Sequence, residues 1–284
     1  MEKFCDLHTH SHFSDGTFTP AQLLDAAEEA RLSAIALCDH NTVLGLPEFL
    51  AAARGRGIEA VPGVEFSTDY RGTELHILAL FIRPEHFGTV TERMEDLHRR
   101  KEQSNRELVA ALNRAGYAID FERIKSKTPR GQINRTHIAA ELTELGYTAS
   151  RKEAFATLLA PGHGYYNPPQ RMDVFQMIGL IKSMGAASVL AHPFLNLKEE
   201  PALRAFLGPA KEAGLDGMEI LYPLYDAEQT RLAASLAAAF DLRPSGGSDF
   251  HGANKPDIRL GTGRGGLAVP LSFLDGLKRA AGLG

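Results

Sequence analysis

Long apolar runs, cysteines and an excess of basic residues are all scarce or absent in this sequence of 284 residues. An uninterrupted run of about 18 apolar residues is missing, so we expect no membrane-spanning helix. The two cysteines, Cys5 and Cys38, form no CxxC pair and lie in apolar runs, which is typical of reduced core thiols and predicts a cytoplasmic protein. The net charge of −4 argues against a broad nucleic-acid-binding surface but leaves room for a local basic pocket.

A signal peptide is not expected either, because residues 1–4 lead directly into an apolar segment. What the chain does contain is an alternation of strand-like and helix-like segments. Seven strands are predicted, at residues 4–7, 33–38, 58–64, 74–82, 187–191, 217–221 and 242–245. Helices between the strands favour parallel strands in βα units, and seven such units favour a closed or nearly closed α/β barrel over an open sheet.

The alternation breaks between residues 86 and 171, where only helices are predicted. We expect a long helix at 90–115 and shorter helices at 136–145 and 150–159, followed by a loop rich in proline and glycine at 161–169. The chain therefore divides into a metal-binding barrel, residues 1–85 with 172–284, and a helical insertion, residues 86–171, which we expect to bind substrate.

Residues that commonly ligate metals follow most of the predicted strands. His8 and His10 lie two residues apart on the first strand, so both side chains point to the same face. Asp15 follows on a loop that Gly16 can turn sharply. The ends of later strands carry the same residue types, at His40, Glu65, His192, Asp249 and His251. Active sites of such barrels lie at the carboxyl ends of the strands, so we expect these side chains to meet there, beneath the insertion.

Six segments resemble, in their order along the chain, the motifs of the PHP (polymerase and histidinol phosphatase) family. They are DLHTHSHFSDG, CDHN, PGVEFS, ELHIL, AHP and GGSDFHG. The resemblance implies a distorted (β/α)7 barrel that holds two or three divalent metal ions. Manganese is expected first, with iron or zinc as alternatives, because imidazole and carboxylate ligands suit these ions better than magnesium or calcium. The ligands that the resemblance implies are His8, His10, Asp15, His40, Glu65, His76, His192, Asp249 and His251.

The resemblance also implies how these ligands divide among the ions. By analogy with trinuclear members, the three sets would be His8, His10, Glu65 and Asp249; Glu65, His76 and His192; and Asp15, His40 and His251. His76 lies near the start of its predicted strand, where a core histidine is the alternative. Three divalent ions outweigh three carboxylates, so the pocket would be cationic and would suit a phosphate ester, attacked by a metal-bound hydroxide.

The helical insertion carries the candidates for substrate recognition. On its long helix, the polar residues Lys101, Ser104 and Asn105 interrupt an apolar stripe, which indicates either a ligand-facing patch or a solvated bend. Arg135 lies at the start of the next helix, where free N–H groups and a planar guanidinium favour an anion, although a surface charge is the alternative. Residues 131–139 also resemble the G-x-x-x-R-x-H-I-A stretch of one PHP branch.

That branch comprises bacterial phosphoesterases that remove the 3′-phosphate of nucleoside 3′,5′-bisphosphates or trim short RNA from its 5′ end. The resemblance implies that one phosphate lies on the metal ions and that Arg135, a catalytic candidate, grips the other with His137. The expected substrate-binding set is Asp15, Ser104, Asn105, Asn134, Arg135, Thr136 and His137. The predicted partner is a nucleotide or a short RNA, with no membrane and no protein partner. The alternatives are a 5′–3′ exonuclease, a histidinol phosphate phosphatase and a structural module without activity.

Overall fold

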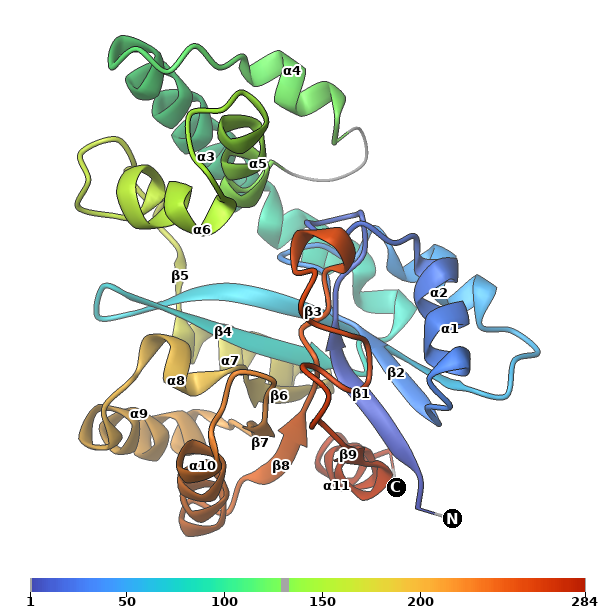
Figure 1. Cartoon of the computed structure of the whole chain (residues 1–284). Coiled ribbons are helices and arrows are strands. Elements are labelled where there is room, and N and C mark those ends of the chain that lie inside the picture. Colours follow the sequence, from blue (N-terminus) through green and yellow to red (C-terminus); the bar gives the residue numbers. More distant parts are fainter. Residues whose placement is uncertain (1, 129–132, 284) are drawn as a thin grey trace.

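A nearly closed sheet forms the body of the computed structural model, which describes residues 2–128 and 133–283 (Figure 1). The strand order is β8-β7-β6-β4-β3-β2-β1-β9, and the short β5 pairs with β3. Backbone hydrogen bonds between residues after β8 and the end of β1 bring the two sides of the sheet together, with Asp249 N–H donating to His8 O at 2.8 Å. The bounds are β1 (Phe4–Thr9), β2 (Ala34–Leu37), β3 (Glu59–Tyr70), β4 (Thr73–Leu80), β5 (Met172–Asp173), β6 (Ala187–Leu190), β7 (Gly217–Leu221), β8 (Arg243–Gly246) and β9 (Val269–Pro270).

Strand direction follows the prediction except at β4. The pairs β1–β2, β2–β3, β6–β7 and β7–β8 are parallel, as βα units require. The prediction of a parallel strand is wrong for β4, which runs antiparallel to both β3 and β6. Only Arg71 and Gly72 separate β3 from β4, both with positive φ, and a two-residue turn makes a hairpin rather than a crossover. The fold class is nevertheless confirmed as a distorted α/β barrel with an inserted helical subdomain.

Helices pack on the outside of the barrel, except for the last helix, whose buried residues join the core on the opposite face of the sheet. They are α1 (Pro20–Glu29), α2 (Leu46–Ala52), α7 (Val174–Ser183), α8 (Pro193–Asn196), α9 (Glu200–Ala213), α10 (Ala227–Ala239) and α11 (Leu271–Ala280). In β2, Ile35 and Leu37 belong to the core that includes residues of α1 and α2. The alternate residues Ala34 and Ala36 point to the other face and join a second core with residues of α11.

The insertion has a hydrophobic core of its own. It contains α3 (Phe87–Arg114), α4 (Phe121–Ser126), α5 (Arg135–Glu144), α6 (Arg151–Ala154) and a π-helical turn at Phe155–Leu159. The first turns of α3 pack on the barrel through Val90 and Met94, whereas Leu108 and Leu112 pack against α5. The sequence did not predict α4. Residues 131 and 132 of the expected anion-binding stretch lie outside the described residues.

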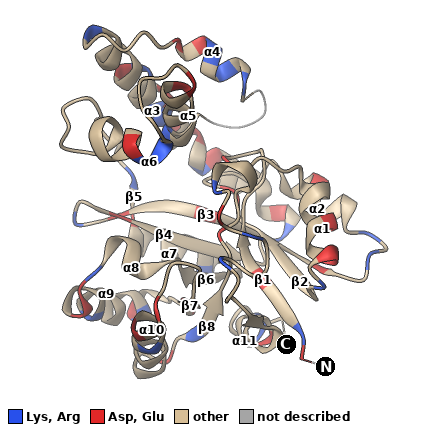
Figure 2. Cartoon of the chain, viewed as in Figure 1, with Lys and Arg blue, Asp and Glu red and all other residues tan. Residues whose placement is uncertain are grey.

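Charged residues of both signs are interspersed over the helices seen in Figure 2. Within residues 2–128 and 133–283, no helix has both the length and the hydropathy needed to cross a bilayer.

Candidate active site

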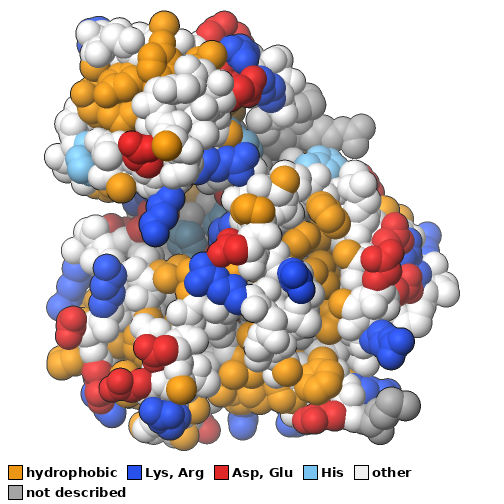
Figure 3. Space-filling view, viewed as in Figure 1, with side chains coloured by type: hydrophobic (Ala, Val, Ile, Leu, Met, Phe, Trp, Pro, Cys, Tyr) orange, Lys and Arg blue, Asp and Glu red, His pale blue; other side chains and the backbone are white. Residues whose placement is uncertain are grey.

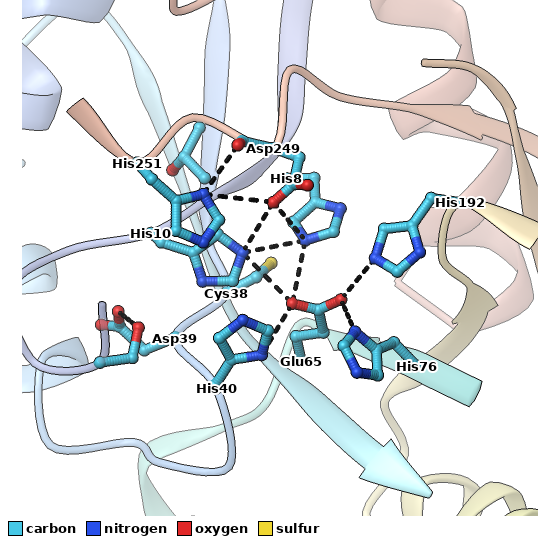
Figure 4. Close-up of polar contacts among 12 residues, drawn as sticks. His8, His10, Cys38, Asp39, His40, Glu65, His76, His192, Asp249 and His251 are labelled. Atoms are coloured by element: carbon cyan, nitrogen blue, oxygen red, sulfur yellow. Dashed lines mark hydrogen bonds and ion pairs between the residues drawn. The ribbon is translucent and has the colours of Figure 1, made fainter. Parts of the chain in front are cut away.

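All nine predicted metal ligands meet at one end of the barrel. Figure 4 labels each of them except Asp15. Their ligand atoms form four overlapping groups, each within 4.8 Å: His10, Asp15, His40 and His251; His8, His10 and Asp249; His8, Glu65 and His192; and His40, Glu65 and His76. His76 belongs to these groups because β4 runs antiparallel, so the start of β4 lies beside the carboxyl ends of the parallel strands. The reversed direction of β4, which was not predicted, therefore places His76 in the cluster, although a core position was the alternative for this histidine.

Glu65, on β3, lies at the centre of the cluster. Its Oε1 is 2.7 Å from His76 Nδ1 and 2.9 Å from His192 Nε2. Its Oε2 lies 3.2 Å from His8 Nε2, 3.2 Å from His10 Nε2 and 3.0 Å from His40 Nδ1. The two oxygens thus face different histidine groups, as a carboxylate bridging two ions would.

The chemistry of the donor set fits metal ions. Within the part of the chain that the structure describes, Asp15 Oδ1, Glu65 Oε2 and His40 Nδ1 are buried close to opposing groups yet make no hydrogen bond. Two imidazole nitrogens, His8 Nε2 and His10 Nε2, face each other at 3.0 Å in the centre of the cluster. Buried polar atoms normally have partners, so a converging set without hydrogen bonds indicates atoms arranged to coordinate cations.

Hydrogen bonds on the outer side of the cluster fix the orientation of its histidines. His8 Nδ1 lies 3.0 Å from Glu219 Oε1, which directs its Nε2 toward the cluster. The other Glu219 oxygen accepts the backbone N–H of His192 at 2.6 Å. The Nδ1 atom of His251 is 2.8 Å from Asp249 O, which likewise leaves Nε2 to face Asp15 at 3.2 Å.

Asp249 has one oxygen for each side of the site. Its Oδ1 faces His10 Nε2 at 3.3 Å, within the cluster. Its Oδ2 accepts hydrogen bonds from Tyr222 Oη at 2.7 Å and from Lys255 Nζ at 2.5 Å. Glu219, Tyr222 and Lys255 were not predicted from the sequence. A buried carboxylate in the apolar strand Gly217–Leu221 was the available signal for Glu219.

Local backbone geometry also positions the ligands. His192 and Asp249 have φ of 28° and 53°, a region that residues other than glycine rarely adopt. The backbone N–H groups of both are held by hydrogen bonds, to Glu219 and to His8 O respectively. A Cβ on Gly16 would lie 2.3 Å from His10 O, so close approach of two backbone segments, rather than an unusual φ, requires glycine there.

A cavity of about 160 Å³ lies between the barrel and the insertion and adjoins the cluster. Figure 3 shows the cleft, with lysine and arginine side chains at its rim and histidine in its depth. Five of the residues predicted to bind substrate line it: Asp15, Asn105, Asn134, Arg135 and Thr136. Lys101, which belongs to the polar patch predicted on the long helix, lines it as well, as does Arg171, which was not predicted.

The remaining two predicted substrate residues have other partners. Ser104 Oγ donates to Asn167 O, which ties α3 to the segment leading back to the barrel. His137 Nδ1 lies 3.0 Å from the backbone nitrogen of Asn134 and so caps α5. Neither lines the cavity beside the cluster, and both contribute instead to the structure of the insertion.

Arg135 lies where this cavity meets another one, which opens above the cluster and is also lined by His192 and Asp249. Its guanidinium lies 4.3 Å from the centre of the Tyr166 ring and donates to Leu159 O at 3.1 Å. It lines both the cluster and the adjoining cavity. A planar, fixed guanidinium in this position can bind a phosphate through two parallel hydrogen bonds.

Glu74 connects the cations of the cavity to the cluster. Its Oε2 accepts a hydrogen bond from Arg171 at 2.7 Å and lies 3.9 Å from Arg135 Nη2. Its Oε1 lies 3.3 Å from His76 Nε2. Burial favours the neutral acid, but the hydrogen bond with His76 and the charges of both arginines hold the pKa of Glu74 well below its ordinary value.

Comparison with known proteins gives concordant matches. A family model described as the PHP domain matches residues 6–154. A 5′–3′ exoribonuclease from Haemophilus influenzae is 32% identical over 251 residues, covering 88% of this chain and 91% of the relative. A 3′,5′-nucleoside bisphosphate phosphatase from Chromobacterium violaceum is 30% identical over 87% of this chain and 86% of the relative. A Bifidobacterium adolescentis structure, described as a metal-dependent phosphoesterase, superposes with a TM-score of 0.86 at 27% identity, over 98% of this chain and 96% of that one.

Proposed function

The chain belongs to the PHP domain family, and on that premise we propose that it removes the 3′-phosphate of nucleoside 3′,5′-bisphosphates in a metal-dependent reaction. One observation carries the proposal: a cluster suited to metal ions lies beside a cavity lined by Lys101, Arg135 and Arg171. Two adjoining sites for anions suit a substrate with two phosphates.

The residues of the cluster would hold two or three divalent ions, in the sets formed around Glu65 and around Asp15. When bound, such ions supply a nucleophile at neutral pH and neutralise the charge of the phosphoryl oxygens. The chain itself fixes the geometry, because Glu219 orients His8 while Tyr222 and Lys255 occupy the outer oxygen of Asp249. Manganese is our first expectation for the metal, with iron or zinc as alternatives.

The second phosphate would bind to the cations of the adjoining cavity. Arg135 is fixed by Tyr166 and faces both cavities, so it can contact the second phosphate while the first lies on the cluster. Arg171 and Lys101 add two more cations. Glu74 neutralises part of this charge in the free protein, so an arriving phosphate competes with a carboxylate that is already bound to Arg171.

A 5′–3′ exoribonuclease is the second candidate, because a relative with that name covers most of the chain. The same two sites would then hold the 5′-phosphate and the first linkage of a strand. Histidinol phosphate fits less well, since its cationic group would lie near Arg135 and Arg171. A structural role fits less well too, because every expected ligand position carries a residue that can bind metal.

The decisive experiment measures kcat/KM of Arg135→Ala on adenosine 3′,5′-bisphosphate and on 3′-AMP. Loss of a charge-assisted hydrogen-bonded contact, about 1.5–3 kcal/mol, should lower the value roughly 10–150-fold on the bisphosphate and change it little on the monophosphate. Arg99→Ala, which removes an exposed arginine of α3, is the matched control and should change neither value.

Equal losses on both substrates would contradict the assignment of Arg135 to the second phosphate. Wild-type protein should also be assayed with histidinol phosphate and with a short 5′-phosphorylated RNA. A faster reaction with histidinol phosphate would overturn the bisphosphate assignment, whereas a faster reaction with RNA would favour the second candidate.

A further inference from the structure

Lys255 lies at the edge of the metal-ligand cluster, on the loop that follows His251. With Arg135, His192 and Asp249 it lines the cavity above the cluster. Its side chain is 38% exposed, although its Nζ is only 2.5 Å from the buried Asp249 Oδ2. The ammonium group therefore has one side against the cluster and another toward the cavity.

Support of Asp249 does not account for all of this arrangement. Tyr222 already donates a hydrogen bond to the same Asp249 oxygen, at 2.7 Å, from a buried position. An ammonium group has three N–H donors, and Asp249 takes one. Among the residues that the structure describes, Nζ of Lys255 has no other hydrogen-bond partner. Two donors remain for a ligand in the cavity.

We propose that Lys255 is a catalytic residue that donates hydrogen bonds to the non-bridging oxygens of the reacting phosphate. This inference rests on the proposed phosphoesterase function and extends it. Lys255 keeps its proton throughout. The bond from phosphorus to the nucleoside oxygen breaks, a bond from phosphorus to a water oxygen forms, and one proton passes from that water to the leaving nucleoside oxygen. The ammonium group compensates the charge on the phosphoryl oxygens. Arg135 then binds the second, non-reacting phosphate, whereas Lys255 binds the reacting phosphate at the cluster.

Tyr222 provides a matched control, because Lys255→Met and Tyr222→Phe each remove one donor from Asp249 Oδ2. The first measurement is the Kd of inorganic phosphate for the metal-loaded protein, by calorimetry. Lys255→Met should weaken phosphate binding about 10–150-fold, as expected for loss of a charge-assisted hydrogen bond. Tyr222→Phe should change it less than about threefold, the scale of a few tenths of a kcal/mol. The metal content of Lys255→Met, by elemental analysis, should match that of wild type.

The second measurement is kcat on adenosine 3′,5′-bisphosphate. Lys255→Met should lower it about 10²–10³-fold, the usual cost of losing one donor to a developing oxyanion, and Lys255→Arg should recover part of the loss. Wild-type phosphate affinity in Lys255→Met, or equal effects of Lys255→Met and Tyr222→Phe on affinity and metal content, would overturn the inference and leave Lys255 as support for Asp249.

Failure of the Lys255 inference and failure of the proposed function would give different results. If wild type binds phosphate through Lys255 but hydrolyses another phosphate ester instead of bisphosphates, the inference stands and the substrate assignment falls. If metal-loaded wild type binds no phosphate, both are overturned.

Discussion

Glu74 Oε1 lies 3.3 Å from His76 Nε2, the ring nitrogen that faces away from Glu65. Carboxylates in this position set the tautomer and orientation of a metal-binding histidine, and their removal typically weakens metal binding about 10–100-fold. The same carboxylate binds Arg171, so one side chain joins the metal cluster to the cavity proposed for the second phosphate.

Glu74→Ala should therefore weaken the binding of one metal ion about 10–100-fold. Glu74→Gln keeps an oxygen that can accept the hydrogen bond of His76, so its metal affinity should stay near that of wild type. Titration of metal-free protein with manganese, followed by calorimetry, measures both. Equal affinities in Glu74→Ala and wild type would show that His76 needs no such partner.

Asp15→Asn and His40→Ala should each lower kcat by several orders of magnitude. Both residues belong to the group that includes His251, so each change should cost one ion that would stabilise transition-state charge. Elemental analysis should show about one ion fewer per chain. Asp25→Asn, at an exposed carboxylate of α1 that pairs with Arg56, is the control. A loss in kcat below about tenfold, or roughly 1.4 kcal/mol, for both variants would mean that this group holds no working ion.

Metal binding should release protons at pH 7.5. Burial lowers the pKa of His10, but the nearby carboxylates of Asp249 and Glu65 outweigh it and raise the pKa to about 9. Burial also lowers the pKa of His76, but the charges and hydrogen bonds of Glu65 and Glu74 outweigh it and raise this pKa to about 10. Both rings are thus protonated in the metal-free protein at pH 7.5 and must lose a proton to coordinate, so metal affinity should fall as the pH falls.

Calorimetric titrations with manganese in buffers of different ionisation enthalpy measure this release directly. The observed heat should change with the buffer, in proportion to the number of protons that the buffer takes up. Identical heats in all buffers would show that the histidines are neutral before the metal binds.

The two cysteines should not react with a thiol reagent in the native protein at pH 8. Both are fully buried, and burial is the main cause that raises the pKa of Cys5 and of Cys38 above the ordinary value. Titration with Ellman's reagent should find no rapidly reacting thiol in the folded protein and two after denaturation. A rapid reaction of the native protein would place one of the thiols at the surface.

The sequence was sufficient for those parts of the site that local patterns determine. The two-residue spacing of His8 and His10 follows from strand periodicity. His40 lies just beyond β2, as predicted, whereas β3 continues past Glu65 to Tyr70, so Glu65 is within its strand and not at the end. His76 required knowledge that β4 reverses direction, which depends on a two-residue turn and not on the apolar pattern of the strand itself. Strand direction is a property of pairing, and pairing was not visible in the strand's own residues.

The missed residues have a common physical cause. Glu219 lies in β7, Tyr222 in the loop after β7, and Arg171 just before β5. The residues around each of them show no pattern that marks a site. Their roles come from contacts over long sequence separations, such as that between His8 and Glu219. Ser104 and His137 illustrate the opposite case, because polar residues at promising helix positions bind their own insertion instead.

The reversal of β4 also determines how the insertion reaches the site. Leu80, the last residue of β4, pairs with Ala187, the first residue of β6, so the chain leaves the barrel at the end remote from the metal ligands. The first 15 residues of α3, Phe87 to Lys101, span about 22 Å and carry the chain back, past a contact of His98 with Asn41 O, to the cavity. The position of Lys101 therefore depends on the length of α3 that precedes it. One extra residue before His98 would rotate the helix beyond it by about 100° and advance it by about 1.5 Å, which would move Lys101 away from its place at the cavity.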